Sequence, residues 1–583
     1  MKTRKTFSLL LVLCALFALY TIEASAAVRS GTCGKDGSSV SWTLDNAGTL
    51  TISGTGEMAD YSYSKSKDAP WYNYRGSVKH ISVGSGVTHI GSDAFRGSAY
   101  LTDVRIANSV TSIGAGAFYK CSALTDITLP GGLTAISDNM FGECKVLRTI
   151  NIPQSVTKIG ASAFAFCNQL GNITIPNGVT EIGAWAFRAC SSFTELTVPS
   201  SVVYIERNAF AACTKLETLT VPFVGGRELY ESGEIVRGYM GFVFDGGNLD
   251  YKSFKSSSIP KSLKTIIVSE GCTVLKDGAF YDFSDVENII LPSTLRQIGN
   301  DAFCYCHSLR SITIPDSVQK VGSNAFYQCK ALESMTLPFI GRDASSTMWS
   351  FGGGGSISYL FGAINDYNDI PAPGIPATLK SIHLTNACKR ILRNAFYGCE
   401  NVEQLTIGSG VETIEGLGVS DKFRSITVSA DNPYYSSDSS GVLFNKDKTG
   451  LIRYPAGSTN TSYEIPDSVT SIGESAFRNC AQLLSVKLPD GLEKLGSNAF
   501  LNCPAVLPIS NFEGAVVPSG AECLTALYSS DGQLLAVKPA LMYDGKPGLF
   551  VPDALKGSVG TAKLFILNSA TLRPVKEAVK KTY

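Results

Sequence analysis

The sequence predicts a mainly β protein with short helical turns, built as a solenoid of stacked 23-residue coils. Three observations predict it: a phenylalanine that returns every 23 residues, apolar columns at fixed offsets before it, and a proline that often ends the main strand. An N-terminal β-cap and a small C-terminal domain similar to a β-sandwich are expected at the two ends. Twelve units align on the repeated residue: Phe95, Phe118, Phe141, Phe164, Phe187, Phe210, Phe280, Phe303, Phe326, Phe396, Phe477 and Phe500.

One unit, residues 147–167, shows how a coil is expected to run. It opens with the alternation of a half-buried strand, which Pro153 ends because proline has no amide to donate. Residues 156–160 fit a second short strand. Ser162 is then expected to cap one helical turn that points Phe164 into the core. Other units place Asn324, Asn394 and Asn498 at the same cap position.

The unit at residues 150–167 reads Ile-x-Ile-Pro-x-x-Val-Thr-x-Ile-Gly-x-x-Ala-Phe-x-x-Cys. This pattern resembles the leucine-rich repeat of the BspA-like bacterial surface-protein family. The resemblance covers about residues 78–510, and twelve units in phase make it specific. It implies a leucine-rich-repeat solenoid, and it implies attachment to host matrix proteins or to other cells.

Residues 1–26 are expected to form a secretory signal peptide. Basic residues open the chain, an apolar run spans residues 7–22, and Ala24-Ser25-Ala26 offers a cleavage site. The run is short for a membrane-spanning helix, so an anchor is the less favoured interpretation. No second apolar stretch of spanning length follows. The mature protein is therefore expected to be secreted, with a possible association with the cell surface.

Residues 27–77 are expected to form a β-hairpin cap on the first coil. Residues 42–44 and 50–52 have strand character on either side of a turn. The aromatic cluster at residues 70–74, Pro-Trp-Tyr-Asn-Tyr, has two interpretations. Packing against the first coil is favoured over stacking on sugar rings.

Three irregular stretches interrupt the period, at about residues 222–262, 338–378 and 429–462. The first two begin alike and end with a recovered repeat strand, which indicates one insert used twice. The third follows two degenerate coils and has hairpin turns at residues 440–441 and 448–450. The rings of the first two inserts either pack onto the solenoid, which is favoured, or contact a ligand. These rings are Tyr230, Tyr239, Phe242, Phe244, Tyr251, Trp349, Phe351, Tyr359, Phe361 and Tyr367.

Residues 511–583 no longer follow the repeat and are expected to form the small C-terminal β domain. This tail is also expected to shield the last coil. Its strand-like segments are residues 524–528, 533–537, 548–551 and 563–567.

The chain has 16 cysteines, which in an exported protein would ordinarily indicate disulfides. Their spacing argues otherwise. In stacked coils, parallel Cβ atoms lie about 4.8 Å apart, wider than a disulfide allows. Most are therefore predicted to be reduced, buried and apolar in character. Pairing of Cys33, Cys304 and Cys523 is left open. Ten others lie three residues after the repeated Phe: Cys121, Cys144, Cys167, Cys190, Cys213, Cys306, Cys329, Cys399, Cys480 and Cys503.

The sequence shows no motif that carries chemistry. Its 50 basic and 50 acidic residues disfavour nucleic acid and anionic membranes as partners. No nucleophile elbow, zinc motif or nucleotide loop is present, so no catalytic residue, cofactor or metal site is predicted. A set with calcium-ligand chemistry fits hairpin turns better: Asp431, Asp438, Asn445 and Asp447. The four histidines are scattered: His80, His89, His307 and His383.

The outward end of the main strand repeatedly carries threonine, which suits a β face but lacks the Trp, Tyr and Arg anchors of strong interfaces. These residues are Thr128, Thr174, Thr197, Thr220, Thr313, Thr336, Thr406 and Thr427.

The predicted function is that of a secreted, non-enzymatic adhesion or recognition protein. It would bind host matrix or cell-surface proteins through a repetitive solenoid face and the aromatic inserts. Two alternatives stay open: a carbohydrate-binding accessory protein of a secreted glycan-degrading system, and a purely structural envelope component. No ligand-binding residue is singled out.

Overall fold

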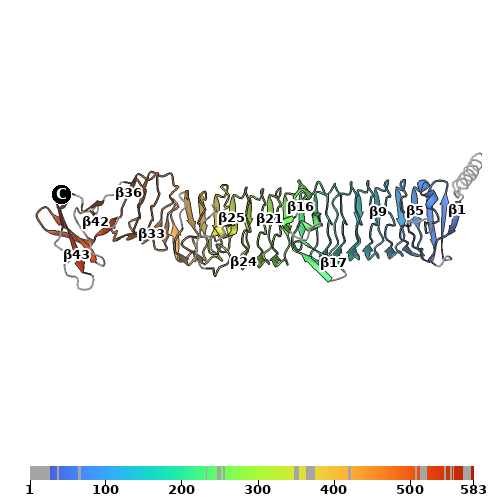
Figure 1. Cartoon of the computed structure of the whole chain (residues 1–583), viewed down its shortest axis with the longest axis horizontal. Coiled ribbons are helices and arrows are strands. Elements are labelled where there is room, and N and C mark those ends of the chain that lie inside the picture. Colours follow the sequence, from blue (N-terminus) through green and yellow to red (C-terminus); the bar gives the residue numbers. More distant parts are fainter. Residues whose placement is uncertain are drawn as a thin grey trace, which may run out of the picture. The chain divides into compact units, whose positions relative to one another are not determined.

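The computed structural model describes residues 27–35, 39–62, 67–230, 233–245, 251–253, 256–346, 354–362, 374–417, 422–505, 509–511, 521–543, 546–551, 555, 557–568 and 579–582. The predicted signal peptide, residues 1–26, lies outside them. The chain divides into two compact units, residues 1–292 and 293–583, and each is described by itself (Figure 1).

In the first unit the chain winds through repeated coils whose strands pair in parallel, as Figure 1 shows. The register moves by one repeat per coil, so that Ile127 pairs with Ile150 on the main strands and Ile159 with Ile182 on the second strands. The predicted mainly β solenoid is confirmed. The main strands are β5 (His80–Val83), β7 (Asp103–Ile106), β9 (Asp126–Thr128), β11 (Thr149–Asn151), β14 (Glu195–Thr197), β16 (Thr218–Val221), β19 (Thr265–Val268) and β21 (Asn288–Ile290). The second strands are β4 (Gly56–Glu57), β6 (Val87–Ile90), β8 (Ser112–Ile113), β10 (Ala135–Ile136), β12 (Lys158–Ile159), β13 (Glu181–Ile182), β15 (Tyr204–Ile205) and β20 (Val274–Leu275).

The repeated phenylalanines form a continuous stack inside these coils. Phe118, Phe141, Phe164 and Phe187 have no exposed surface. Neighbouring rings in this run lie 5.5–5.7 Å apart, centroid to centroid, with planes within 14° of parallel. Each buried ring contributes about 1.5–3 kcal/mol through removal of apolar surface from water. The core of the first unit is therefore a column of like side chains, as the period predicts.

The predicted helical turn and its serine cap are wrong. Ser162 and Phe166 have φ values of +53° and +62°, which no right-handed helix allows. This backbone lets alternate amides point at the next coil: Ser162 N donates to Ala184 O and Phe164 N to Ala186 O, both at 2.8 Å. A helical turn would use those amides within itself. Asn324 and Asn498 take the same left-handed conformation, and Asn394 also lies in a turn and starts no helix.

Three antiparallel strands precede the first coil: β1 (Ala27–Thr32), β2 (Val40–Asp45) and β3 (Thr49–Gly54). The strand pair predicted on either side of the turn is present, and β3 pairs in parallel with β5. Trp71 is buried, stacks on Phe95 at 5.9 Å and donates from Nε1 to the carbonyl of Ala94 at 2.8 Å. It therefore begins the stack of rings. The 3-10 helix η1 (Tyr72–Ser77) follows it.

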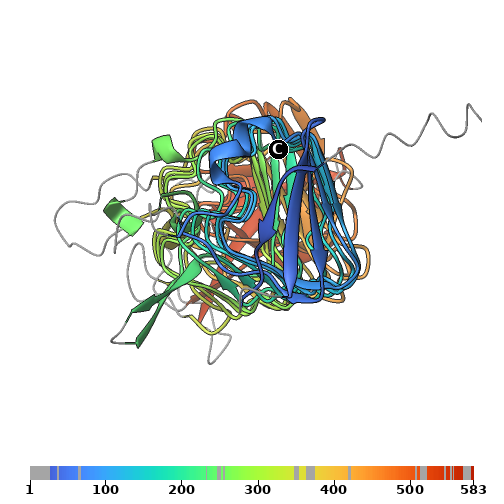
Figure 2. The same cartoon turned by 90° about the vertical axis from the view of Figure 1, so that its right-hand side faces the viewer.

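The first insert lies within one enlarged coil, because β16 pairs directly with β19. It opens with a hairpin of β17 (Gly226–Tyr230) and β18 (Gly233–Arg237), drawn in green in Figures 1 and 2, which stands out from the coils. The short helix α2 (Phe242–Asp245) then takes the place of a repeat turn. Two 3-10 turns, η2 (Tyr251–Ser253) and η3 (Ser256–Ser258), complete the described part of the insert.

Backbone hydrogen bonds show how the insert rebuilds the turn. The amide of Phe210 donates to Val243 O at 3.0 Å, and Met240 N donates to Ala279 O at 2.7 Å. Phe244 lies 6.5 Å from Phe210 and 6.2 Å from Phe283, centroid to centroid. The insert thus continues the aromatic core of the first unit.

The second unit repeats the same coil. Its main strands are β23 (Ser311–Thr313), β25 (Ser334–Leu337), β26 (Ser381–Leu384), β28 (Gln404–Ile407), β30 (Ser425–Val428), β34 (Ser462–Glu464) and β36 (Ser485–Lys487). Its second strands are β22 (Gln297–Ile298), β24 (Lys320–Val321), β27 (Arg390–Ile391), β29 (Thr413–Ile414), β35 (Ser471–Ile472) and β37 (Lys494–Leu495). The second insert again supplies a turn, here the 3-10 helix η4 (Ile357–Phe361), and Phe361 lies 6.2 Å from Phe326.

The third irregular stretch forms the antiparallel strands β31 (Tyr435–Ser437), β32 (Leu443–Asn445) and β33 (Gly450–Arg453). The two predicted hairpin turns join them, and β33 pairs in parallel with β35, so that the coils resume.

The four strand segments predicted near the C-terminus are present. They fall in β39 (Ala521–Ser529), β40 (Leu534–Pro539), β42 (Lys546–Phe550) and β43 (Val559–Asn568). One sheet has the order β40-β39-β43-β44, and the other has the order β38-β42-β41, where the further strands are β38 (Ile509–Asn511), β41 (Leu541–Tyr543) and β44 (Val579–Thr582). Phe550 packs in the same buried cluster as Phe477 and Phe500. That residues 511–583 form a separate domain stays a prediction, as do the boundaries of the N-terminal cap.

Candidate functional site

The residues with possible calcium chemistry serve as turn residues. Asp438 Oδ1 accepts from the amides of Ser440 and Val442 at 3.0 and 2.9 Å, and its Oδ2 accepts from the Tyr463 hydroxyl. Asn445 Oδ1 accepts from Gly450 N at 2.8 Å. Asp431 and Asp447 are exposed. Throughout the described ranges, no three His, Cys, Asp or Glu side chains are grouped so that they could hold a metal ion.

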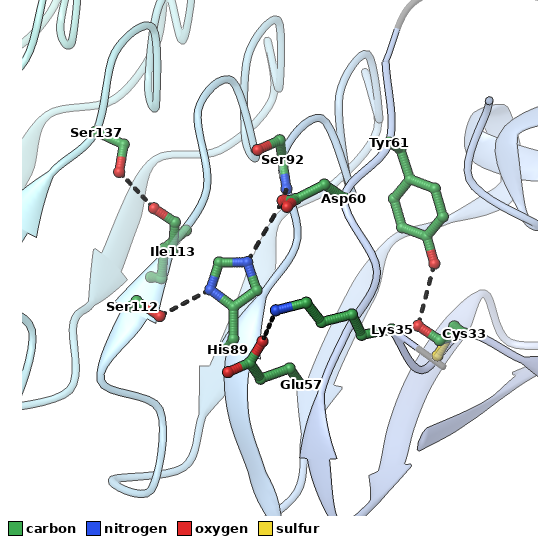
Figure 3. Close-up of polar contacts among 10 residues, drawn as sticks. All are labelled: Cys33, Lys35, Glu57, Asp60, Tyr61, His89, Ser92, Ser112, Ile113 and Ser137. Atoms are coloured by element: carbon green, nitrogen blue, oxygen red, sulfur yellow. Dashed lines mark hydrogen bonds and ion pairs between the residues drawn. The ribbon is translucent and has the colours of Figure 1, made fainter. Parts of the chain in front are cut away.

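His89 takes part in a chain of polar contacts between the N-terminal segment and the first coils (Figure 3). Its Nδ1 lies 2.7 Å from Ser112 Oγ, and its Nε2 lies 3.4 Å from Asp60 Oδ1. The same Asp60 oxygen accepts from the Ser92 amide at 2.7 Å, which holds down the pKa of the carboxyl group. A serine hydroxyl, an imidazole and a carboxylate are thus linked in the order Ser112, His89 and Asp60, as in a catalytic triad. Because the carboxylate contact is long and its oxygen is already held by an amide, we assign this chain a structural role.

Further contacts in Figure 3 tie the same strands together: Lys35 Nζ to Glu57 Oε2 at 2.7 Å, Tyr61 Oη to Cys33 O at 3.3 Å, and Ser137 Oγ to Ile113 O at 2.5 Å.

The cysteines of the repeat column face the core, as predicted. Cys121, Cys144 and Cys167 have no exposed surface. Each thiol donates to the carbonyl of the repeat phenylalanine one coil back; the Cys144 bond to Phe118 O is 3.2 Å. Burial raises the pKa of the Cys144 thiol to about 12, so this thiol is neutral and unreactive at ordinary pH. At the end of the column, a hydrogen bond with Cys480 lowers the pKa of the half-buried Cys503 to about 7. Among the residues left open, Cys33 and Cys304 are buried and Cys523 is half-buried, and none of the three forms a disulfide.

The insert aromatics do not form a binding surface where the structure describes them. Tyr239, Phe242, Phe244 and Phe361 are at most 5% exposed. The favoured packing interpretation is therefore confirmed for these four rings. The alternative, that they contact a ligand, is wrong, because the rings lie in the core. Tyr251 and Tyr359 are partly buried. The side chain of Tyr230 and the residues Trp349, Phe351 and Tyr367 lie outside the described set.

The threonine column lies on the outer face of the main strands, as predicted. Thr197 and Thr220 pair in register in the first unit, and Thr313 pairs with Thr336 in the second. All eight threonines are exposed or partly exposed. The face is regular and carries short hydroxyl groups.

A second surface, which the sequence reasoning missed, lies along the turns of the first unit. We call it the turn edge. It consists of side chains next to the buried Phe column: Tyr72, Arg75, Arg96, Tyr119, Phe166, Trp185, Arg188 and Arg207. Aromatic rings and cations pair along it: Arg75 over Tyr72 at 3.7 Å, Arg96 over Tyr119 at 4.5 Å, Arg188 over Phe166 at 5.2 Å and Arg207 over Trp185 at 5.0 Å. Phe166 is 38% exposed, a high value for a phenylalanine. Tyr, Trp and Arg are the residue types that concentrate binding energy at interfaces.

At one end of the turn edge lies a pocket of about 450 Å³. We call it the basic pocket, and it is lined by Tyr72, Arg75, Arg96, Gly97, Ala99, Lys120, Ser122, Glu143 and Lys145. Four cations and one carboxylate line it, although the chain as a whole has no net charge. The sequence did not reveal this pocket because its residues occupy the columns that vary between units, and a search for invariant columns passes over them.

The comparisons with known proteins agree with this architecture. A family model described as BspA type leucine rich repeat region, in six copies, matches residues 69–191, 136–224, 248–348, 376–432 and 456–523. Together these ranges make up more than half of the chain. No curated protein matches. Among the described residues, no helix is long and apolar enough to cross a membrane.

Solved structures of bacterial leucine-rich-repeat proteins are also similar. One from Bacteroides ovatus is 22% identical and covers 80% of this chain and 91% of its own, with a TM-score of 0.30. One from Eubacterium ventriosum is 19% identical and covers 84% and 97%, with a TM-score of 0.26. A leucine-rich cell surface protein from Faecalibacterium prausnitzii is 21% identical and covers 68% and 96%, with a TM-score of 0.27. From the repeat, the coil and the extent of the family match, the chain belongs to the BspA-type leucine-rich-repeat family.

Proposed function

We propose that this chain is an exported, non-enzymatic protein of adhesion or recognition, which binds host matrix or cell-surface proteins through the turn edge of its first unit. Export is supported by the signal-like residues 1–26, and the family match supports a surface-protein role. The thiols of Cys121, Cys144 and Cys167 are buried within an apolar interior, which supports a scaffold role.

The observation that carries the proposal is the row of cation–aromatic pairs on the turn edge, whose rings are exposed or partly exposed. Phe166, Trp185 and Arg188 lie within two neighbouring coils and have the chemistry of interface anchors. The threonine face offers only short hydroxyl groups. A row of weak contacts on one chain also favours multivalent attachment, where a second contact is made at high local concentration.

The test is a binding screen with residues 27–583 against immobilised extracellular-matrix proteins. An edge variant carries Phe166→Ala and Trp185→Ala. A strand-face control carries Thr128→Ala and Thr197→Ala, at exposed positions of the main strands. We expect the edge variant to lose binding at least about tenfold, because interface anchors each carry about 2 kcal/mol or more. The control should bind as the unmodified protein does. Equal binding by the edge variant would remove the turn edge from the proposal.

A structural envelope component would bind none of the matrix proteins in this screen. A carbohydrate-binding role is the second candidate, and one observation favours it specifically: the basic pocket combines cations with the Tyr72 ring and a hydrogen-bond acceptor.

A further inference from the structure

The basic pocket is built by four successive turns of the first unit. Its lining residues come from residues 72–75, 96–99, 120–122 and 143–145, one group for each coil. Coils are stacked about 4.8 Å apart, so cations on neighbouring coils form a row along the solenoid. Gly97, Ala99 and Ser122 have short side chains, which leave the room that the pocket occupies.

The positive charge of the pocket is only partly neutralised. Lys145 makes no ion pair with any described residue. Lys120 Nζ lies 3.5 Å from Glu143 Oε1, and Arg96 Nη1 lies 3.1 Å from Asp93 Oδ1. Arg75 donates one hydrogen bond, from Nη1 to Tyr72 O at 2.7 Å, so most of its five donors stay available. An anionic ligand would meet an excess of positive charge here.

Several side chains at the pocket are held in place before a ligand arrives. Arg75 lies on the Tyr72 ring, and Arg96 lies on the Tyr119 ring. The Tyr119 hydroxyl donates to Glu143 Oε1 at 2.5 Å. Burial and this carboxylate raise the pKa of Tyr119 to about 12, so the hydroxyl keeps its proton at neutral pH. A prearranged set of donors loses less conformational freedom on binding.

Two features favour a sugar over an acidic peptide. The amides of Gly97, Lys120 and Glu143 already donate to the carbonyls of the next coil, at 2.7–2.8 Å, so they offer no strand edge to an incoming peptide backbone. Glu143 can accept hydrogen bonds from sugar hydroxyls, and the side chains of an acidic peptide offer no such donors.

We propose that the basic pocket binds an acidic sugar unit, carrying a carboxylate or a sulfate group, of an extracellular polysaccharide. Arg75, Arg96, Lys120 and Lys145 hold the acid groups, and Glu143 and Ser122 hold hydroxyl groups. Because the cations form a row across successive coils, they can bind several acid groups of one polysaccharide chain at the same time. This inference rests on the proposed function, because both place the turn edge in contact with an extracellular partner.

The test is calorimetric titration of residues 27–583 with four probes: a sulfated glycosaminoglycan oligosaccharide, a uronic-acid oligosaccharide without sulfate, a neutral oligosaccharide of equal length and a polyglutamate peptide. We expect one or both acidic sugars to bind, with an affinity that falls as salt rises, while the neutral sugar does not bind. The first two probes distinguish sulfate from carboxylate recognition. Tighter binding of polyglutamate than of either acidic sugar would overturn the proposal in favour of an acidic protein partner.

The pocket variant carries Arg75→Ala and Lys145→Ala. Its matched control, Arg105→Ala with Arg310→Ala, removes the same charge from side chains that are 82% and 61% exposed and outside the pocket. We expect the pocket variant to lose at least about tenfold in affinity for the acidic sugar and the control less than about twofold. Equal losses in both variants would reduce the site to general charge attraction and overturn the proposal.

Glu143→Gln separates the proposed site from an ion-exchange surface in a second way. Simple charge attraction predicts tighter sugar binding after loss of the carboxylate, whereas a role in holding hydroxyl groups predicts weaker binding. We expect weaker binding of sugar together with tighter binding of polyglutamate.

The same preparations separate this inference from the proposed function. If matrix proteins bind through Phe166 and Trp185 while no acidic sugar binds, the pocket inference fails and the proposed function stands. If acidic sugars bind and matrix proteins do not, the partner class of the proposed function is wrong and the pocket assignment stands.

Discussion

Single residues two positions apart have opposite roles in the repeat turn. Phe164 is buried in the ring stack, and Phe166 is 38% exposed on the turn edge. The left-handed residue at each side of the turn makes this possible, since it turns alternate amides toward the next coil. The column of repeated phenylalanines correctly predicted that Phe164 faces the core. The predicted helix cap at Ser162 is wrong, because serine is common both at helix caps and in tight turns.

The pair Phe164→Ala and Phe166→Ala tests this division. We expect Phe164→Ala to lower the free energy of unfolding by about 3–5 kcal/mol, because it leaves a cavity between two stacked rings. Phe166→Ala should change it by no more than about 0.5 kcal/mol, because the ring is partly in water. Equilibrium urea unfolding measures both. Similar losses in the two variants would contradict the assignment of the two faces.

The buried thiols give the protein a specific weakness to alkali. Burial raises the pKa of Cys144 and of Cys213 to about 12, whereas a thiol in an unfolded chain has a pKa of about 8.5. The native state therefore keeps protons that the unfolded chain releases. The stabilising effect is complete below about pH 8.5 and is lost as the pH rises toward about 12, by up to about 1.4 kcal/mol per pH unit for each thiol.

We therefore expect the urea midpoint to fall between about pH 9 and about pH 11, and to fall less steeply in Cys144→Ala, which lacks one such thiol. The slope against pH is the readout, so any loss of stability in the variant at neutral pH does not matter. An unchanged slope would show that this thiol does not titrate between the two states.

At the scale of elements, each of the first two inserts supplies a replacement turn, and the first also adds a hairpin. In the first, α2 carries Phe244 into the core, and the hairpin of β17 and β18 stands away from the coils. The shared opening sequences and the recovered repeat strands predicted one insert used twice. The core role of Phe244 could not be read from the period, because the insert places it at a different distance from the preceding Phe.

Replacing residues 226–237 by a short Gly-Ser linker tests this view of the insert. We expect the thermal midpoint to stay nearly unchanged, because the hairpin lies outside the turn that α2 forms. Phe244→Ala should instead cost about 3–5 kcal/mol, as expected for a buried ring. If removal of the hairpin destabilised the chain as much as Phe244→Ala does, the hairpin would be part of the core.

At the scale of the molecule, stability comes from contacts between neighbouring coils, and the ends need protection. In the first unit, β3 covers the edge of β5, and Trp71 covers the first repeat ring, Phe95. The period predicted the solenoid because each coil repeats the same apolar columns. The basic pocket could not be predicted in this way, since Arg96, Lys120 and Lys145 belong to variable columns that meet only after stacking.

A chain that begins at residue 78 tests the need for protection at the N-terminal end. It lacks β1 to β3 and Trp71, so it exposes the β5 edge and an aromatic ring. We expect it to associate into large species in size-exclusion chromatography with light scattering, since open strand edges pair with one another. The control begins at residue 33 and lacks only β1; it should stay monodisperse. A monodisperse chain from residue 78 would show that the first coil needs no cover.

The uniform register of the coils also bears on how such a gene can change. Ile127, Ile150, Ile159 and Ile182 meet their neighbours one repeat away, so any two coils joined at the same point of the unit present matching surfaces to each other. Recombination that duplicates or deletes a whole unit would therefore leave the interior closed, whereas the loss of part of a unit would leave one coil without its matching columns. The length of the solenoid and the number of its contact sites can therefore change with the number of repeat units. No new core packing has to evolve for this.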